Sequence, residues 1–181
     1  LRFFYHLAKD PLNLINKLRT NVRDDLNYNE TILKDLSFNL EGIKSKLKEY
    51  NYDYLDPHLS WHYHLYTGFS QKFKNVKILE IGTYLGEFTR FLSNIFPGSK
   101  IITCDLKHDD KNFRSIYDRQ SEKKFEVFID KRNQNLNRDN IKFLELDSLN
   151  LLDKFPRNEF DLIWIDGDHL NPQVSFDIFQ S

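Results

Sequence analysis

The chain has 181 residues, enough for one or two domains, with 26 basic and 27 acidic residues and a formal net charge of −1. A charge this close to zero argues against a broad basic surface for nucleic acid, and the lack of a run of about twenty apolar residues argues against a membrane span. The single cysteine, Cys104, lies in a predicted strand and provides no disulfide framework, and the expected location is the cytoplasm.

The first third of the chain is predicted to be helical. One helix begins near Asp10-Pro11, and a longer amphipathic stretch runs from about Asn29 to Tyr50, with apolar residues on one face. Isolated helices of this length are marginal in water, so they must pack on something. We therefore assign residues 1–55 to a helical cap on the rest of the chain, or to a dimerisation arm or lid, and residues 56–181 to a sheet domain.

The next segment, Pro57 to Phe73, is rich in aromatic residues and histidine and is predicted to lead as a helix into the first strand. His58 and His62 would be i, i+4 partners on that helix. No glutamate or cysteine stands where a zinc site would need one, so zinc is disfavoured. Tyr63 and Tyr66 are expected in the core, with a wall of the ligand pocket as the alternative.

The segment from Val76 to Thr89 reads V-K-I-L-E-I-G-T-Y-L-G-E-F-T and predicts a strand, a glycine turn and a helix. The strand brings Glu80 to the turn, where Gly82 and Gly86 lie four positions apart. Apolar residues then recur at helical spacing from Phe88 to Phe96. Glycines in such a turn permit unusual backbone angles and close approach of a ligand. The G-x-G-x-x-G fingerprint of dinucleotide sites is absent, so an NAD site is disfavoured.

Three further strands are predicted, and each ends in an acid. They cover Lys100–Asp105, Ile141–Asp147 and Phe160–Asp166, with helices expected at about residues 123–135, 149–154 and 172–179. Alternating strands and helices predict a parallel sheet with right-handed crossovers, and such sheets bind ligands beyond the carboxyl ends of their strands. The acids at the four strand ends are therefore expected to form one site.

The E-x-G-x-x-x-G turn and the segment F-D-L-I-W-I-D-G-D-H at residues 160–169 resemble class I methyltransferases that use S-adenosylmethionine (SAM). The chain is most similar to small-molecule O-methyltransferases of the catechol, caffeoyl-CoA and macrolide-sugar type. The resemblance implies an α/β, Rossmann-like sheet of strand order 3-2-1-4, C-terminally incomplete, with an N-terminal helical segment. The SAM contacts that it implies are Glu80, Gly82, Thr83, Tyr84, Gly86, Asp105, Asp147, Ser148 and Asp166. Where some relatives place a small hydroxyl residue near the SAM carboxylate this chain has Phe88, so Thr89 or backbone amides are expected to replace it.

In the metal-dependent relatives the acid after the fourth strand binds Mg²⁺ or another hard divalent ion, and several place a lysine as general base three residues later. Asp166 and His169 match these two positions, so the resemblance implies that both are catalytic and that Asp166 binds the metal. Histidine side chains exchange protons near neutral pH, which suits removal of a hydroxyl proton. The relatives' other metal ligands follow a fifth strand that these residues do not include. A tight turn, with Asp168 capping the next helix, is the alternative interpretation.

The expected function is O-methylation of a small-molecule or sugar hydroxyl. The alternatives are an N-methyltransferase, an aminopropyltransferase-like enzyme on the same fold, or a non-catalytic SAM-fold domain that serves assembly. The fourth strand is apolar and would form an exposed edge, so residues beyond Ser181 or another chain are expected to cover it. A homodimer would form through that edge or through the N-terminal helices.

Overall fold

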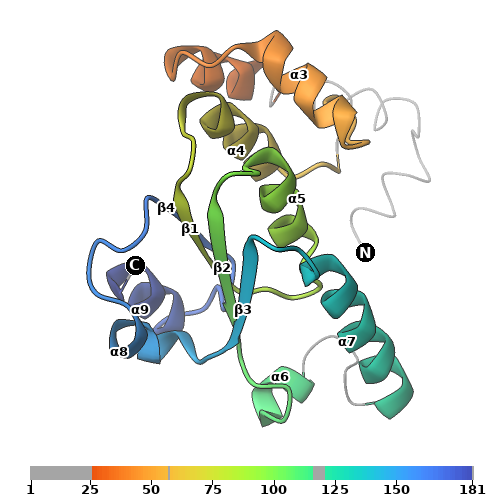
Figure 1. Ribbon diagram of the computed structural model, residues 1–181, viewed down its shortest axis with the longest axis vertical. Coiled ribbons are helices and arrows are strands. Elements are labelled where there is room, and N and C mark those ends of the chain that lie inside the picture. The colour runs from red at the N-terminus through yellow and green to blue at the C-terminus, as the bar shows by residue number, and fades with distance from the viewer. Residues whose placement is uncertain (1–25, 57, 116–120, 181) are drawn as a thin grey trace, which may run out of the picture. The chain divides into compact units, whose positions relative to one another are not determined.

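The computed structural model describes residues 26–56, 58–115 and 121–180, and it divides into two compact units with the boundary between Lys72 and Phe73 (Figure 1). The helix predicted near Asp10-Pro11 lies outside the described residues. The predicted boundary lay after residue 55. The structure places the aromatic helix α4, Trp61–Lys72, in the first unit, because it packs on the helix before it. Among the described residues, no helix is long and apolar enough to cross a membrane.

The first unit contains a helix over residues 26–35, then α3, Leu40–Glu49, and α4. The prediction of one helix from Asn29 to Tyr50 was wrong, because the chain turns at Ser37, whose φ is +57°. Asn39 begins α3, with its side chain accepting a hydrogen bond from the amide of Gly42. The buried apolar residues of the first unit are Leu33, Phe38, Ile43, Leu47, Tyr54 and Tyr66.

Two contacts fix α4 against the start of α3. Gln71 donates to the Asn39 carbonyl and accepts from the Asn39 amide, both at 2.8 Å. Gly68 leaves room for the Phe38 ring, since an added Cβ would lie 2.3 Å from it. His58 lies before α4 rather than on it, so the predicted i, i+4 pair with His62 does not form on a helix. Tyr66 is buried in this unit as expected.

The second unit is a parallel four-stranded sheet of order β3-β2-β1-β4, which confirms the predicted α/β, Rossmann-like class and strand order. The strands are β1, Lys77–Ile81; β2, Lys100–Asp105; β3, Ile141–Glu145; and β4, Leu162–Ile165. The helices are α5, Glu87–Ile95; α6, Lys111–Ser115; α7, Glu122–Leu136; α8, Leu151–Lys154, after a 3-10 turn at Ser148–Asn150; and α9, Gln173–Gln180.

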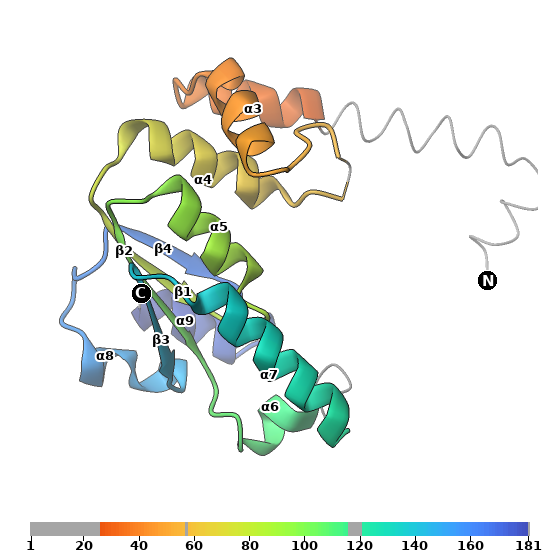
Figure 2. The ribbon, with the colours of Figure 1, turned by 45° about the vertical axis from the view of Figure 1, so that its right-hand side comes forward.

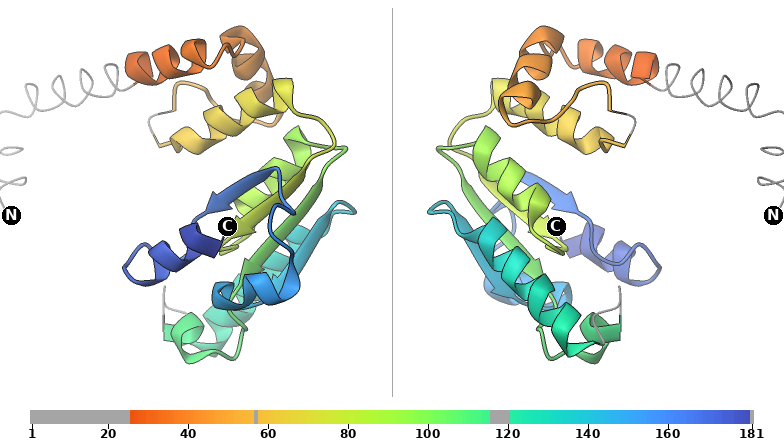
Figure 3. Two further views of the ribbon diagram at one scale, coloured as in Figure 1. Left: turned by 90° about the vertical axis from the view of Figure 1, so that its left-hand side faces the viewer. Right: turned by 90° about the vertical axis from the view of Figure 1, so that its right-hand side faces the viewer.

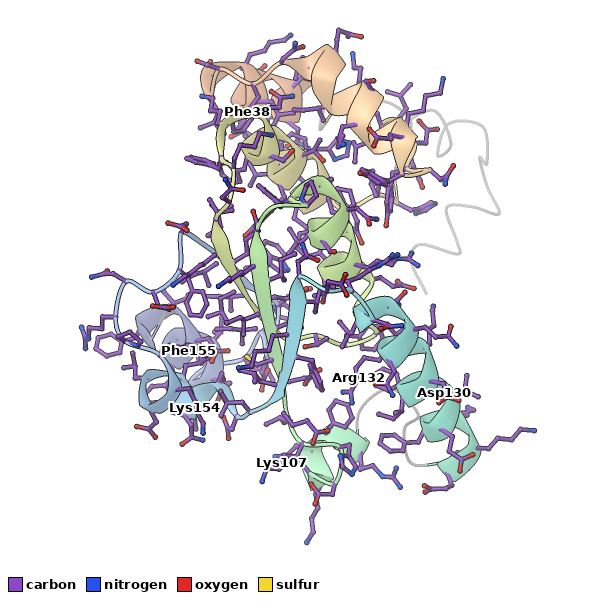
Figure 4. All side chains as sticks on the ribbon, in the orientation of Figure 1. Phe38, Lys107, Asp130, Arg132, Lys154 and Phe155 are labelled. Carbon is purple, nitrogen blue, oxygen red and sulfur yellow. The ribbon has the colours of Figure 1, made fainter. Side chains whose placement is uncertain are left out.

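Helices α5 and α7 cover one face of the sheet, and α8 and α9 lie on the other (Figures 2 and 3). Because side chains alternate along a strand, Ile78 and Glu80 of β1 face α5, while Leu79 and Ile81 join the core under α8. Cys104 is buried in that second core, as predicted. Figure 4 shows Arg132 on α7 and Phe155 after α8 on opposite sides of the sheet.

Within the described residues, β4 pairs only with β1, so its other edge carries no strand. Its four residues are half-buried. The expectation that further residues or another chain cover this edge stays a prediction.

Candidate functional site

The four acidic residues singled out by the sequence lie at the carboxyl ends of the four strands. Glu80 is the last residue but one of β1 and Asp105 the last of β2, while Asp166 directly follows β4. Asp147 lies two residues beyond β3 and begins the 3-10 turn. Because all four strands are parallel, these ends share one edge of the sheet, which is where open α/β sheets bind ligands (Figure 1).

The glycine turn joins β1 to α5 through three residues with positive φ: Gly82 at +97°, Tyr84 at +48° and Gly86 at +69°. A Cβ on Gly82 would lie 2.2 Å from the carbonyl oxygen of Asp166, so the glycine permits the turn to touch the backbone after β4. A Cβ on Gly86 would lie 2.8 Å from Leu136 of α7. The positive φ of both glycines confirms the predicted unusual backbone angles, and protein atoms lie where a Cβ on either glycine would stand. The predicted close approach of a ligand stays a prediction.

Glu80 is the buried centre of a hydrogen-bonded network. Its carboxylate is 2% exposed and accepts from the hydroxyl of Thr103 at 2.6 Å and from that of Thr89 on α5. Thr103 in turn is 2.6 Å from the hydroxyl of Thr83 in the glycine turn. One carboxylate thus ties β1, β2, the turn and α5 together. Thr89 is committed to Glu80, so the structure does not offer its hydroxyl to a SAM carboxylate as the sequence suggested.

The environment of Glu80 changes its proton affinity. Burial raises the pKa of the Glu80 carboxyl to about 7, and the negative charges of Asp166 and Asp105 add to the effect, while the two threonine hydrogen bonds oppose it. The effect of Asp166 and Asp105 on this pKa indicates that the ends of β1, β2 and β4 lie within electrostatic reach of one another. A cationic ligand group at this edge would favour the ionised form of Glu80.

Asp105 holds the glycine turn against the end of β2. One carboxylate oxygen accepts from the amide of Tyr84 at 2.9 Å, and the other accepts from the amide of Leu106 at 2.9 Å. The side chain of Asp105 is half-buried. The Tyr84 ring is 44% exposed and lies 5.5 Å from the Phe128 ring of α7. The two backbone hydrogen bonds therefore fix the orientation of Asp105 at the end of β2.

Asp147 and Ser148 form the turn after β3. Asp147 accepts from the amide of Leu149 at 3.0 Å, which begins the 3-10 turn. The Ser148 hydroxyl accepts from the side-chain amide of Gln173 on α9 at 2.8 Å. Gln173 was not singled out in the sequence, and no sequence pattern would have connected it with Ser148.

Asp166 and His169 lie together in the turn after β4, with the nearest nitrogen and oxygen 3.6 Å apart. Their side chains are 44% and 76% exposed, so both are open to an incoming molecule. Asp168 accepts from the amide of Leu170 at 2.9 Å, which makes it the cap of a local turn rather than of α9. The turn after β4 therefore leaves the side chains of Asp166 and His169 exposed at the carboxyl ends of the strands.

The predicted divalent site is not complete among the described residues. Within residues 26–56, 58–115 and 121–180, no group of three or more His, Cys, Asp or Glu side chains is arranged to hold a metal ion. Asp166 has only His169 beside it, and hard divalent ions prefer several oxygen ligands. The described residues therefore do not complete a site for a hard divalent ion.

Comparison with known proteins places this geometry in a family. A family model described as a methyltransferase domain matches residues 79–180. Two solved structures are similar at low identity: the O-methyltransferase TomG from Streptomyces achromogenes, involved in tomaymycin synthesis, in complex with SAM, and an O-methyltransferase from Bacillus cereus in complex with SAH. The first is 17% identical, with 78% of this chain and 60% of that chain covered and a TM-score of 0.44. The second is 20% identical, with 86% and 60% covered and a TM-score of 0.37.

This chain thus spans about three fifths of the length of either enzyme. No curated protein matches it. The family match begins inside β1, includes the glycine turn and all four strand ends, and extends over more than half of the chain. The chain therefore belongs to the methyltransferase domain family.

Proposed function

We propose that the second unit binds SAM along the carboxyl edge of its sheet and transfers the methyl group to a hydroxyl of a small-molecule or sugar acceptor. The observation that carries the proposal is the ordered set of acids at four parallel strand ends, next to the glycine turn of a methyltransferase domain. Such an edge offers carboxylates to the cationic and hydroxyl-bearing parts of a nucleoside cofactor.

The residues at the edge fit the parts of SAM. Asp105, with its orientation fixed by two backbone amides, accepts the ribose hydroxyl hydrogens. Glu80 balances the positive amino group, because its buried carboxylate lies between the turn and α5. Asp147 and Ser148 adjoin the adenine. When bound, SAM supplies a methyl group on a positively charged sulfur.

The acceptor side is assigned to Asp166 and His169. Asp166 accepts a hydrogen bond from an acceptor hydroxyl, and His169 removes the proton as the oxygen attacks the methyl carbon in line. Both side chains are exposed and are not hydrogen-bonded to each other at 3.6 Å, so the acceptor itself would complete their arrangement. Catalysis then depends mainly on holding the oxygen and the methyl group at attack distance.

The other candidate functions differ in what they bind or release. An N-methyltransferase would release S-adenosylhomocysteine when amines, rather than hydroxyl compounds, are supplied as acceptors. An aminopropyltransferase-like enzyme would use a decarboxylated SAM. An assembly domain would bind SAM without turnover. Participation of Mg²⁺, and a homodimer through residues 1–55 or the free edge of β4, also stay predictions, to be tested by chelation and by sedimentation.

Calorimetry with SAM, S-adenosylhomocysteine and NAD on the full-length protein tests the proposal. We expect binding of the first two and not of NAD. Release of S-adenosylhomocysteine is then measured with catechols, phenols, sugars and amines as acceptors. Asp166→Ala and His169→Ala are expected to lose at least about 100-fold in turnover while retaining SAM binding, as is typical when a general base is removed. Asp168→Asn is the control, since an asparagine retains the cap on Leu170. Absence of SAM binding would refute the proposal.

A further inference from the structure

Helix α9 has an inverted polarity that packing alone does not explain. Among the side chains of residues 173–179, the one that is fully buried is a carboxylate, Asp177, which is 1% exposed. Its large apolar residues Phe176, Ile178 and Phe179 are 47%, 63% and 76% exposed. Burying a carboxylate is costly unless it is hydrogen-bonded or paired, whereas burying phenylalanine would be favourable. The polar side chains of α9 therefore need partners on the buried side of the helix.

Those polar side chains connect two loops of the site. The side-chain amide of Gln173 donates to Asp177 at 3.1 Å, one helical turn away, and to the hydroxyl of Ser148 at 2.8 Å. The other carboxylate oxygen of Asp177 is 3.5 Å from the place where a Cβ on Gly167 would stand, so Asp177 lies beside the turn after β4. Gln173 thus bonds the turn after β3 to the helix, and Asp177, its partner on the helix, lies next to the turn after β4.

The sheet itself does not make this connection. In the order β3-β2-β1-β4, the two turns follow strands that lie at opposite edges and share no hydrogen bonds. Ser148 lies on the side assigned to the cofactor, and Gly167 lies between Asp166 and His169 on the side assigned to the acceptor. Helix α9 therefore adds a side-chain connection between the two sides that direct pairing of β3 with β4 does not provide.

We propose that Gln173 and Asp177 are positioning residues that fix the cofactor side and the acceptor side of the site relative to each other. This inference rests on the proposed function for its consequence, but not for its geometry. Methyl transfer requires the acceptor oxygen in line with the methyl carbon, and a displacement of about 1 Å can reduce the rate by about 100-fold. Loss of the pair would loosen both turns together without disturbing the core strands.

Asp177→Leu tests this role in the full-length protein. Leucine has a similar volume; it removes a buried carboxylate, which favours stability, and it removes an acceptor of Gln173, which opposes it, so a melting temperature close to that of the parent is expected. Amide hydrogen exchange is expected to rise at residues 147–150 and at 166–169 together, and SAM affinity to fall about tenfold. Asp177→Asn retains an oxygen that accepts from Gln173, so it should restore protection in both segments. Ser175→Ala is the matched control on α9, because the Ser175 hydroxyl donates a hydrogen bond to the exposed side chain of Asn171 rather than to either turn of the site.

The outcomes separate the inference from the proposed function. Hydrogen exchange needs no ligand, so a joint rise in exchange of both segments in Asp177→Leu would support the positioning role whether or not the wild-type protein binds SAM. Failure of the wild-type protein to bind SAM would refute only the proposed function. Unchanged exchange in either segment would overturn the inference. A general rise in exchange together with a lower melting temperature in Asp177→Leu would also overturn it, since that result indicates an ordinary structural role.

Discussion

Replacing Glu80 by glutamine is expected to remove a pH-dependent loss of stability from the second unit. The folded protein buries the Glu80 carboxyl, and its pKa rises from 4.5 to about 7, with burial as the largest cause. Below pH 4.5 the folded and unfolded states both hold the proton. Between pH 4.5 and 7 only the folded state holds it, so the free energy of unfolding falls as the pH rises.

The magnitude follows from the size of the shift. Each pH unit in this window lowers the free energy of unfolding by about 1.36 kcal/mol, so the whole window lowers it by about 3 kcal/mol. The stability that Glu80 contributes is complete below pH 4.5 and absent above pH 7. A glutamine at position 80 does not titrate, and its side-chain oxygen accepts from Thr103 and Thr89 as the carboxylate does.

The two tryptophans allow the second unit to be followed alone. Trp61 lies on α4 and Trp164 on β4, so a Trp61→Phe background leaves Trp164 as the reporter of the sheet unit. Urea unfolding at pH 4.5 and pH 8 should show about 3 kcal/mol more loss in the parent than in Glu80→Gln. Glu87→Gln, at an exposed position on α5, is the control and should behave like the parent. An equal loss in the parent and Glu80→Gln would refute the reasoning.

Three further changes have defined outcomes. Gly82→Ala should lower the unfolding free energy of the second unit by about 3 kcal/mol or more, because its Cβ would meet the Asp166 carbonyl at 2.2 Å with a φ of +97°. Gly98→Ala is the control, because a Cβ there would meet only the movable side chain of Asn75, and equal urea midpoints for the two variants would contradict the argument. Asp105→Asn should weaken SAM binding about tenfold in calorimetry, since an asparagine accepts through one oxygen only, and unchanged affinity would remove Asp105 from the ribose site. Burial lowers the pKa of His64 from 6.5, so the first unit should lose stability as the pH falls below 6.5, and Trp61 fluorescence in a Trp164→Phe background should show no such loss in His64→Gln.

The sheet could be predicted because each strand combines an apolar run with a terminal acid and is separated from the next by a helical pattern. The helix expected at about residues 123–135 was found at Glu122–Leu136, and the second strand was found over the residues predicted. The spacing of apolar residues gave a wrong prediction where it continues across a turn of the chain. The apolar spacing from Asn29 to Tyr50 runs through Ser37, yet the chain turns there. The five-residue helix α6 is too short for a periodic signal and was missed.

The strand-end acids of the site could be predicted, but most of their partners could not. Thr103 is the exception, because Glu80 and Thr103 are paired in the parallel register of β1 and β2, and pairing follows once strand order is known. Gln173 and Asp177 depend on how α9 packs against the turns after β3 and β4. A helix was predicted at about residues 172–179, but nothing in the sequence indicated that a carboxylate, Asp177, would be buried on it.

The structure adds to the motif a set of internal contacts that the sequence did not indicate. In E-x-G-x-x-x-G, the acid is directed at hydroxyls of β2 and α5, and the space beside the first glycine is occupied by the backbone after β4. Both features hold the turn against its neighbours: Glu80 through Thr103 and Thr89, and Gly82 through its close approach to Asp166. The same turn places Asp105, whose orientation the Tyr84 amide fixes, beside the half-exposed Tyr84 ring. We therefore expect discrimination between SAM and a dinucleotide to depend on the acids that the turn brings together as well as on the spacing of its glycines.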